Sequence, residues 1–159
     1  MYNVNGNRVD IIITDENFMP KRGTQLAAAY DLKVSIDTDA HFILPGCTHR
    51  FNSNVRIDQR KFILPDPFSI AALVIPRSGL GSSGLVISNL VGLIDPDYQG
   101  EVKVNLWNRT LDTPIQITNK MKVAQLLFVV TVQPELFVVD SFESETERGE
   151  GGHGSTGIH

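Results

Sequence analysis

The sequence is short of cysteine, of net positive charge and of long apolar runs, and each shortage excludes a class of protein. Its single cysteine, Cys47, excludes an internal disulfide and a cysteine-based zinc cluster, and predicts a reducing location such as the cytoplasm. A formal net charge of -4 argues against a nucleic-acid partner. The longest apolar stretch, residues 126–132, is too short to span a membrane, and the polar residues 1–8 lack the apolar core of a signal peptide.

Helical periodicity is also scarce, and only one helical turn is expected, after Ser78. Instead, short runs of β-branched and aromatic residues alternate with turn residues, which is typical of strands. We expect strands at residues 9–14, 30–35, 41–44, 53–57, 68–75, 85–88, 102–107, 115–118 and 124–132. So many short strands in 159 residues predict one all-β domain with a closed or double-sheet antiparallel fold, such as a jelly roll.

The composition changes after Asp140. Residues 141–150 are polar and acidic, and residues 149–157 are rich in glycine. Such a composition is typical of a mobile terminus. We therefore expect a β domain over residues 1–140 and a flexible C-terminal arm over residues 141–159.

An aspartate-rich turn separates two of the expected strands. Residues 92–100 read Gly-Leu-Ile-Asp-Pro-Asp-Tyr-Gln-Gly, which predicts a tight hairpin connection. Aspartate is common in turns, so Asp95 and Asp97 could serve the turn alone. A carboxylate held at the ends of two strands could instead orient a water molecule, because a rigid sheet supports it well. The turn by itself leaves both interpretations open.

A second candidate follows the expected strand 68–75. Arg77, Ser78 and Gly79 bring together an arginine, a hydroxyl group and exposed peptide N–H groups, a combination that binds anions such as phosphate. An ordinary exit from a strand into a loop would have the same composition.

The glycine-rich tail holds further side chains of phosphate-binding types. Arg148, Ser155 and Thr156 are such residues, and His153 adds a flat ring. The tail lacks the Gly-Lys-Ser/Thr ending of a Walker A loop, which excludes that motif. It is either a plain flexible terminus or an arm that folds over a ligand.

Taken in order, these segments resemble the motifs of the trimeric deoxyuridine triphosphatase (dUTPase) family. The resemblance covers nearly the whole chain, and the order of the segments makes it specific where each segment alone would be weak. The five matching segments are Ala-Ala-Tyr-Asp-Leu at 28–32, Pro-Arg-Ser-Gly-Leu at 76–80, residues 89–100 with Ile-Asp-Pro-Asp-Tyr inside, Val-Ala-Gln-Leu at 123–126, and residues 148–157.

The resemblance implies a fold, an assembly and an activity. The family fold is a jelly-roll β-barrel that forms a homotrimer with three active sites between subunits, where the arm of one subunit closes a site built by the other two. The implied activity is hydrolysis of dUTP to dUMP and pyrophosphate by attack of water on the α-phosphorus. Such an enzyme keeps uracil out of DNA and supplies dUMP for thymidylate synthesis.

The resemblance also implies roles for individual residues. Asp95 would hold the attacking water and the 3′-hydroxyl side of the pocket, and Tyr98 would pack against the deoxyribose. The strand edges and side chain expected to read uracil belong to Leu93, Ile94, Lys103 and Asn89. The residues expected to bind the phosphate chain are Arg77, Ser78, Gly79 and Gln125. From the arm, Arg148, Ser155 and Thr156 would close over the phosphates, and His153 would stack on the base. Mg²⁺ would sit on the phosphate oxygens without direct protein ligands, with Asp31 orienting an arginine or a magnesium-bound water.

Two positions depart from the family pattern, and one segment has no predicted role. Ala29 stands where the family usually has glycine, and His153 stands where it usually has phenylalanine. Residues 51–67 form a stretch longer than the family needs.

Three alternative functions stay open. The first is a dCTP deaminase, an enzyme of the same fold that would need a glutamate-based site and lacks such a tail. The second is a dUTP sensor that signals to a protein partner, and the third is a purely structural jelly roll that binds no nucleotide.

Overall fold

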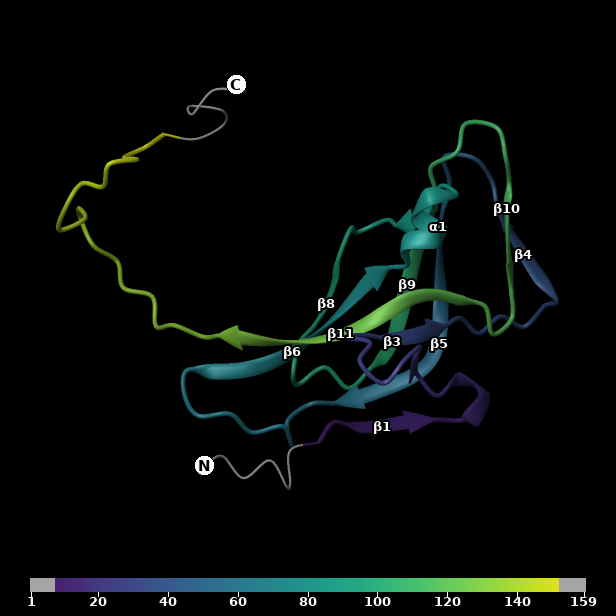
Figure 1. The fold of residues 1–159 in the computed structure, drawn as a ribbon, viewed down its shortest axis with the longest axis horizontal. Helices are drawn as coiled ribbons and strands as arrows, with labels where there is room; N and C mark the ends of the chain where they lie inside the picture. The colour runs from purple at the N-terminus through teal and green to yellow at the C-terminus, as the bar shows by residue number, and fades with distance from the viewer. Residues whose placement is uncertain (1–7, 152–159) are drawn as a thin grey trace.

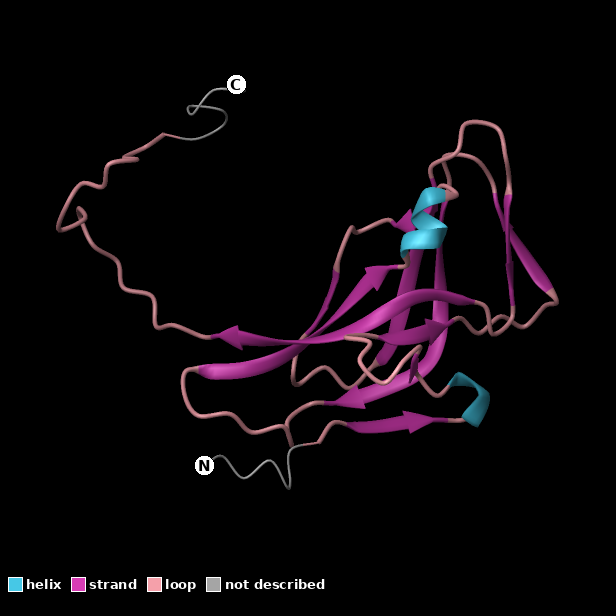
Figure 2. Cartoon of the chain, in the orientation of Figure 1, coloured by secondary structure: helices cyan, strands magenta, loops and turns pink. Residues whose placement is uncertain are grey.

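Strands are the main secondary structure of the computed structural model, which describes residues 8–151 (Figures 1 and 2). Two short helical segments interrupt the strands, the 3-10 helix η1 (Glu16–Phe18) and the helix α1 (Ser78–Ser82). The predicted all-β class is therefore confirmed, and α1 is the helical turn expected after Ser78.

A four-stranded antiparallel sheet forms one side of the core. In spatial order its strands are β1 (Asp10–Ile13), β5 (Thr48–Asp58), β9 (Glu101–Asn108) and β7 (Leu85–Ile87). Alternation places the side chains of Val102, Val104 and Leu106 in the core and those of Lys103 and Asn105 on the opposite face. This alternation is the period-two pattern of the sequence.

A five-stranded sheet and a two-stranded sheet complete the fold. The larger contains, in spatial order, β2 (Lys21–Arg22), β3 (Tyr30–Lys33), β11 (Lys122–Val132), β6 (Phe68–Pro76) and β8 (Gly92–Ile94). The smaller pairs β10 (Ile115–Thr118) with β4 (Ala40–Ile43). All of these pairs are antiparallel.

The hydrophobic core draws side chains from all three sheets. Leu32 of β3, Val104 of β9 and Ile117 of β10 are each completely buried in the same apolar cluster. This layered arrangement is consistent with the expected jelly roll. The expectation of a closed barrel is wrong for the described strands, because they form three separate sheets with free edges.

The two strands expected on either side of residues 92–100 do pair antiparallel, as β7 and β9, but the connection between them is not the tight hairpin that was expected. β8 pairs with β6 in the five-stranded sheet, whereas β9 pairs with β5 and β7 in the four-stranded sheet. The chain thus passes from one sheet to the other between Ile94 and Glu101. Turn composition cannot distinguish such a crossing from a hairpin, because pairing depends on strands far away in the sequence.

After Val132 the described chain contains no helix or strand. This segment leaves the end of β11 and runs away from the sheets (Figure 1). The division at residue 140 and the flexibility of the arm stay predictions. Within residues 8–151, no helix is long and apolar enough to cross a membrane.

Two stacked histidines join the two-stranded sheet to β5. The rings of His41 and His49 lie 3.9 Å apart between centroids, and His49 also packs against Phe51 at 4.5 Å. His49 is exposed, but these rings cover part of it. This partial desolvation lowers the pKa of His49, and the neighbouring His41 lowers it further.

We expect this histidine pair to make folding weaker in mild acid. Because the pKa of His49 is lower in the folded protein than in the unfolded chain, the unfolded chain binds the proton more readily. Stability is then full above the unfolded pKa of about 6.5 and is lost as the pH falls below it. A His49→Gln variant should show a flatter dependence of melting temperature on pH between 5 and 8. A slope equal to that of the parent would contradict this assignment.

Candidate active site

A pocket of about 230 Å³ lies where β8 and β9 run beside each other without pairing. Its lining residues come from both strands, from the turn between them and from β5: Leu93, Ile94, Asp95, Tyr98, Lys103, Asn105 and Arg50. Five of these, Leu93, Ile94, Asp95, Tyr98 and Lys103, were predicted as site residues. The tertiary structure brings them together in one cavity.

The turn that carries Asp95 is closed by its own backbone. The N–H of Tyr98 donates to the carbonyl of Asp95 at 3.1 Å, which is the i to i+3 bond of a tight turn. The Tyr98 hydroxyl donates to the carbonyl of Glu101 at 3.1 Å, so its ring folds back over the turn. The Asp95 side chain is exposed at the pocket, where it can reach a ligand or a water molecule.

Backbone groups on both sides of the pocket lack strand partners. β8 is an edge strand whose only strand neighbour among the described residues is β6. β9 pairs with β7 only over Leu106–Asn108, beyond Lys103. Such free edges can donate to and accept from a planar ligand. The side chain of Asn89 lies outside the pocket lining and donates to the carbonyl of Val91 at 3.4 Å.

Sequence reasoning did not assign Arg50 and Asn105 to the site. They contact each other across β5 and β9, with the Arg50 Nε donating to the Asn105 Oδ1 at 3.1 Å. The alternation of residues 102–107 places Asn105 on the same face as Lys103, and that signal could have identified it. Arg50 depends on the register of β5 against β9, which pairs it with Asn105 and which no local pattern reveals.

A second group of predicted residues gathers around the buried Asp31. Gln125 of β11 pairs with Asp31 of β3 on one side and with Ile75 of β6 on the other, so these three residues lie side by side across the sheet. Arg77 follows directly after the end of β6. Arg77 precedes α1, and its Nε lies 3.3 Å from a carboxylate oxygen of Asp31. Its Nη1 also donates to the carbonyl of Lys122 at 3.1 Å. Ser78 and Gly79 begin α1 and are exposed.

Asp31 is therefore fully engaged by cations. The Lys122 Nζ lies 2.9 Å from its second carboxylate oxygen. Asp31 thus contacts an arginine, as in one of the two arrangements considered for it. Its paired oxygens hold Arg77 and Lys122 together at the surface, which concentrates positive charge beside the hydroxyl of Ser78.

Within one chain the two groups do not meet. None of Arg77, Ser78, Gly79 and Gln125 lines the pocket of Asp95. Arg148 of the tail makes a local hydrogen bond, in which its Nε donates to the carbonyl of Gly151 at 3.0 Å. It does not line the pocket of Asp95 either. His153, Ser155 and Thr156 lie outside the described residues.

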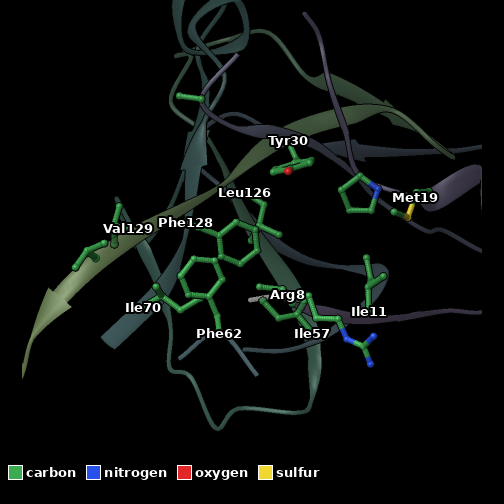
Figure 3. Close-up of a pocket in the computed structure, with 14 residues that line it drawn as sticks. Arg8, Ile11, Met19, Tyr30, Ile57, Phe62, Ile70, Leu126, Phe128 and Val129 are labelled. Atoms are coloured by element: carbon green, nitrogen blue, oxygen red, sulfur yellow. The ribbon is translucent and has the colours of Figure 1, made fainter. Parts of the chain in front are cut away.

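A larger cavity of about 560 Å³ lies elsewhere, between β1, β3, β6 and β11 (Figure 3). Its lining is almost wholly apolar, with the rings of Phe62 and Phe128 pointing into it. Arg8 is the only charged residue that lines it among the described residues. Among the described residues, Arg8 and Tyr30 are the only side chains with polar atoms that line this cavity, and it has no carboxylate or histidine, so the smaller pocket with Asp95 is the candidate active site.

Among residues 8–151, no three histidine, cysteine, aspartate or glutamate side chains lie close enough together to hold a metal ion. Both oxygens of Asp31 are taken by Arg77 and Lys122, and Asp95 is the only carboxylate among the described residues that line its pocket. A metal ion bound mainly by the phosphate groups of a ligand therefore fits these residues better than a metal ion bound by protein side chains alone.

The fold and the two polar groups define an all-β protein with an aspartate-bearing turn and a separate arginine-based anion group. The dUTPase family model matches residues 15–157, and the chain belongs to that family. It is 42% identical over 156 residues to the deoxyuridine 5'-triphosphate nucleotidohydrolase of Ralstonia nicotianae, covering 96% of this chain and 99% of the relative.

Solved structures of phage proteins show the same fold. The dUTPase of Staphylococcus bacteriophage 80alpha with dUPNHPP superposes with a TM-score of 0.78 at 26% identity, covering 96% of this chain and 99% of the other. A mutant dUTPase from phage phi11 of S. aureus, described with a structural Mg(II) ion, gives a TM-score of 0.70 at 25% identity, covering 87% and 100%.

Gly100 leaves room for the Tyr98 ring, and we expect Gly100→Ala to displace it. A Cβ at position 100 would lie 2.5 Å from the Tyr98 Cζ, so the ring must leave the Glu101 carbonyl and the pocket wall. Affinity for a non-hydrolysable dUTP analogue should fall about tenfold, since a hydrogen bond and its packing contribute about 1 kcal/mol or more. Isothermal titration measures this. Gly23→Ala, which meets no atom within 4 Å, is the control, and equal affinity in both variants would contradict the expectation.

Proposed function

We propose that this chain hydrolyses dUTP to dUMP and pyrophosphate, with Asp95 holding the water that attacks the α-phosphorus. Its membership of the dUTPase family supports this activity. The observation that carries the residue assignment is the pocket between β8 and β9, in which Asp95 is the only carboxylate among the described lining residues. An aspartate carboxylate can accept a hydrogen bond from water and so hold it for attack.

The free strand edges beside the pocket account for recognition of uracil. Backbone N–H and C=O groups near Leu93, Ile94 and Lys103 would pair with the base, and the Asn89 amide would turn from Val91 to add side-chain bonds. Cytosine presents a donor where uracil presents an acceptor, so it would leave a buried group unpaired, which discriminates strongly. Tyr98, folded back over the turn, would fill the space that a 2′-hydroxyl needs.

The group around Asp31 supplies positive charge for the triphosphate. Arg77, held by Asp31, would grip the phosphate chain together with Ser78, Gly79 and Gln125. Arg148, Ser155 and Thr156 of the arm would close over the γ-phosphate, and His153 would stack on the base. Mg²⁺ bound to the phosphate oxygens would neutralise charge and fix the in-line geometry, and Asp31, already paired with cations, would not ligate it directly.

A homotrimer with shared active sites would unite groups that one chain keeps apart. Arg77 and Gln125 do not line the pocket of Asp95, so a complete site would take them from a second subunit. The described tail also leaves large apolar side chains uncovered, which favours association. These exposed residues are Leu136, Phe137, Val138, Val139 and Phe142. A free thiol at Cys47 and the absence of cysteine elsewhere suit a cytoplasmic location.

A pyrophosphate-release assay with dUTP, dCTP, dTTP and UTP, each with and without Mg²⁺, tests the proposed activity. We expect release from dUTP alone at an appreciable rate, and a slower rate without Mg²⁺. Deamination of dCTP would instead establish the deaminase alternative, and binding of dUTP without turnover would establish the sensor.

Asp95→Asn should abolish most turnover while leaving the fold and dUTP binding nearly intact. The amide keeps the size of the side chain but cannot accept a proton from the attacking water, so we expect kcat to fall by about 10²- to 10⁴-fold. Asp97→Asn, in the same turn but outside the pocket lining, is the matched control and should keep most of the activity. Hydrolysis by the Asp95→Asn variant at the parent rate would show that Asp95 is not the catalytic carboxylate.

Truncation after Glu147 should leave a folded trimer with little activity. The shortened chain keeps every strand and the apolar residues 136–142, but it loses Arg148 and the remainder of the glycine-rich motif. Light scattering measures the assembly, and pyrophosphate release measures the activity. Full activity in the truncated protein would reduce the arm to a linker, and a monomer would contradict the assignment of assembly to the remaining residues.

A further inference from the structure

We infer that Gln59 is a positioning residue for Asp95, acting through the backbone of the turn that carries it; this inference rests on the proposed function. Gln59 directly follows β5, in the segment 51–67 to which the sequence assigns no role. Its side chain is 1% exposed. Its Nε2 donates to the carbonyl of Ile94 and to the carbonyl of Asp95, each at 3.1 Å.

The orientation of this amide follows from its partners. Both groups that it contacts are carbonyl oxygens, which only accept hydrogen bonds, so the NH₂ end must face them. The Gln59 Oε1 is buried and has no hydrogen-bond partner within the described structure. A buried acceptor without a donor weakens folding, so the two hydrogen bonds from the Nε2 come with a local cost at the Oε1. Such local costs are typical of residues that serve a site.

The carbonyl of Asp95 is thereby held from two directions. Tyr98 donates to it from within the turn at 3.1 Å, and Gln59 donates from the end of β5. The turn bond fixes only the shape of the turn. Gln59 fixes the turn relative to the four-stranded sheet, which also carries Lys103 and Asn105 on the opposite wall of the pocket.

The same end of β5 also holds the far side of the turn. The Gln99 Nε2 donates to a carboxylate oxygen of Asp58 at 2.8 Å, and the Arg56 Nε donates to the Gln99 carbonyl at 2.8 Å. Hydrogen bonds from the Arg60 side chain and backbone hold the pKa of Asp58 far below its usual range, so Asp58 stays an acceptor. Gln99 and Arg56 are exposed and Asp58 is partly exposed, whereas Gln59 is buried where it contacts the Asp95 carbonyl. Gln59 is therefore the contact that solvent competes with least.

Small displacements of Asp95 matter because a misplacement of about 1 Å can slow an enzyme by about 100-fold. Loss of the Gln59 bonds would free the backbone of Ile94 and Asp95 without removing any group that touches substrate. The effect should fall on kcat more than on KM, since Leu93 and Lys103 are held by their own strand partners, Leu73 and Asn52, and the phosphate-binding group stays in place.

Gln59→Glu tests the inference through pH. An ionised glutamate has no hydrogen to donate and would face two carbonyl oxygens, whereas a protonated one donates from its hydroxyl. Burial raises the pKa of such a carboxyl group toward neutrality. Steady-state hydrolysis of dUTP from pH 5 to pH 9 should give a kcat about 10- to 100-fold below the parent at high pH, recovering toward the parent at low pH. Gln116→Glu, which adds the same charge on the exposed face of β10, should show no such step.

Gln59→Met, which keeps the length of the side chain and removes both donors, provides the second variant. It should lower kcat at every pH with little change in KM, and it decides the question if Gln59→Glu does not fold. A kcat equal to that of the parent in Gln59→Met would overturn the inference. So would a fall in kcat that is matched by an equal rise in KM and shows no pH step in Gln59→Glu. Failure of the parent itself to hydrolyse dUTP would overturn the proposed function instead.

Discussion

The passage of the chain from one sheet to another between Ile94 and Glu101 is the constraint on which the site depends. β8 and β9 follow each other in the chain but pair with different partners, β6 and β5. Among the described strands, β8 has no strand neighbour on its side away from β6, and β9 has none beside Lys103 on its side away from β5. A tight hairpin would have paired these two edges with each other.

The same architecture separates the two halves of the proposed chemistry. Asp31, Gln125 and Ile75 lie side by side in the five-stranded sheet, and Arg77 follows the end of β6. Asp95 instead follows the end of β8. Neither half is a complete site for the proposed reaction, because one carries the arginine and lysine paired with Asp31 and the other carries the carboxylate of Asp95. Association of identical chains is the simplest way to join them, and the uncovered apolar side chains near the tail supply a surface for it.

The segment after β5 gives the site its rigidity on one side. Residues that follow a strand directly inherit its fixed position, so Gln59 can hold the turn without any contact to substrate. Its buried oxygen without a partner is the kind of local conflict that a well-packed core would otherwise avoid.

By itself, the sequence determined the class of fold and singled out five of the residues that line the smaller pocket. Alternating apolar residues predicted strands such as β9 and β10 within one or two residues, because side-chain alternation is a local property of a strand. The ordered motifs likewise predicted Asp95, Tyr98 and Arg77.

The tertiary structure alone decided which strands pair. The pairing in turn decided that the turn at residues 95–100 connects two sheets. The described strands form three sheets that are not closed into a barrel, and the connection between the paired strands β7 and β9 crosses to another sheet through β8 instead of forming a tight hairpin. Arg50 and Gln59 join the site through contacts with residues 55 and 36 positions away, Asn105 and Asp95. No local pattern encodes such contacts, because they arise from the register of β5 against β9 and from packing across the core.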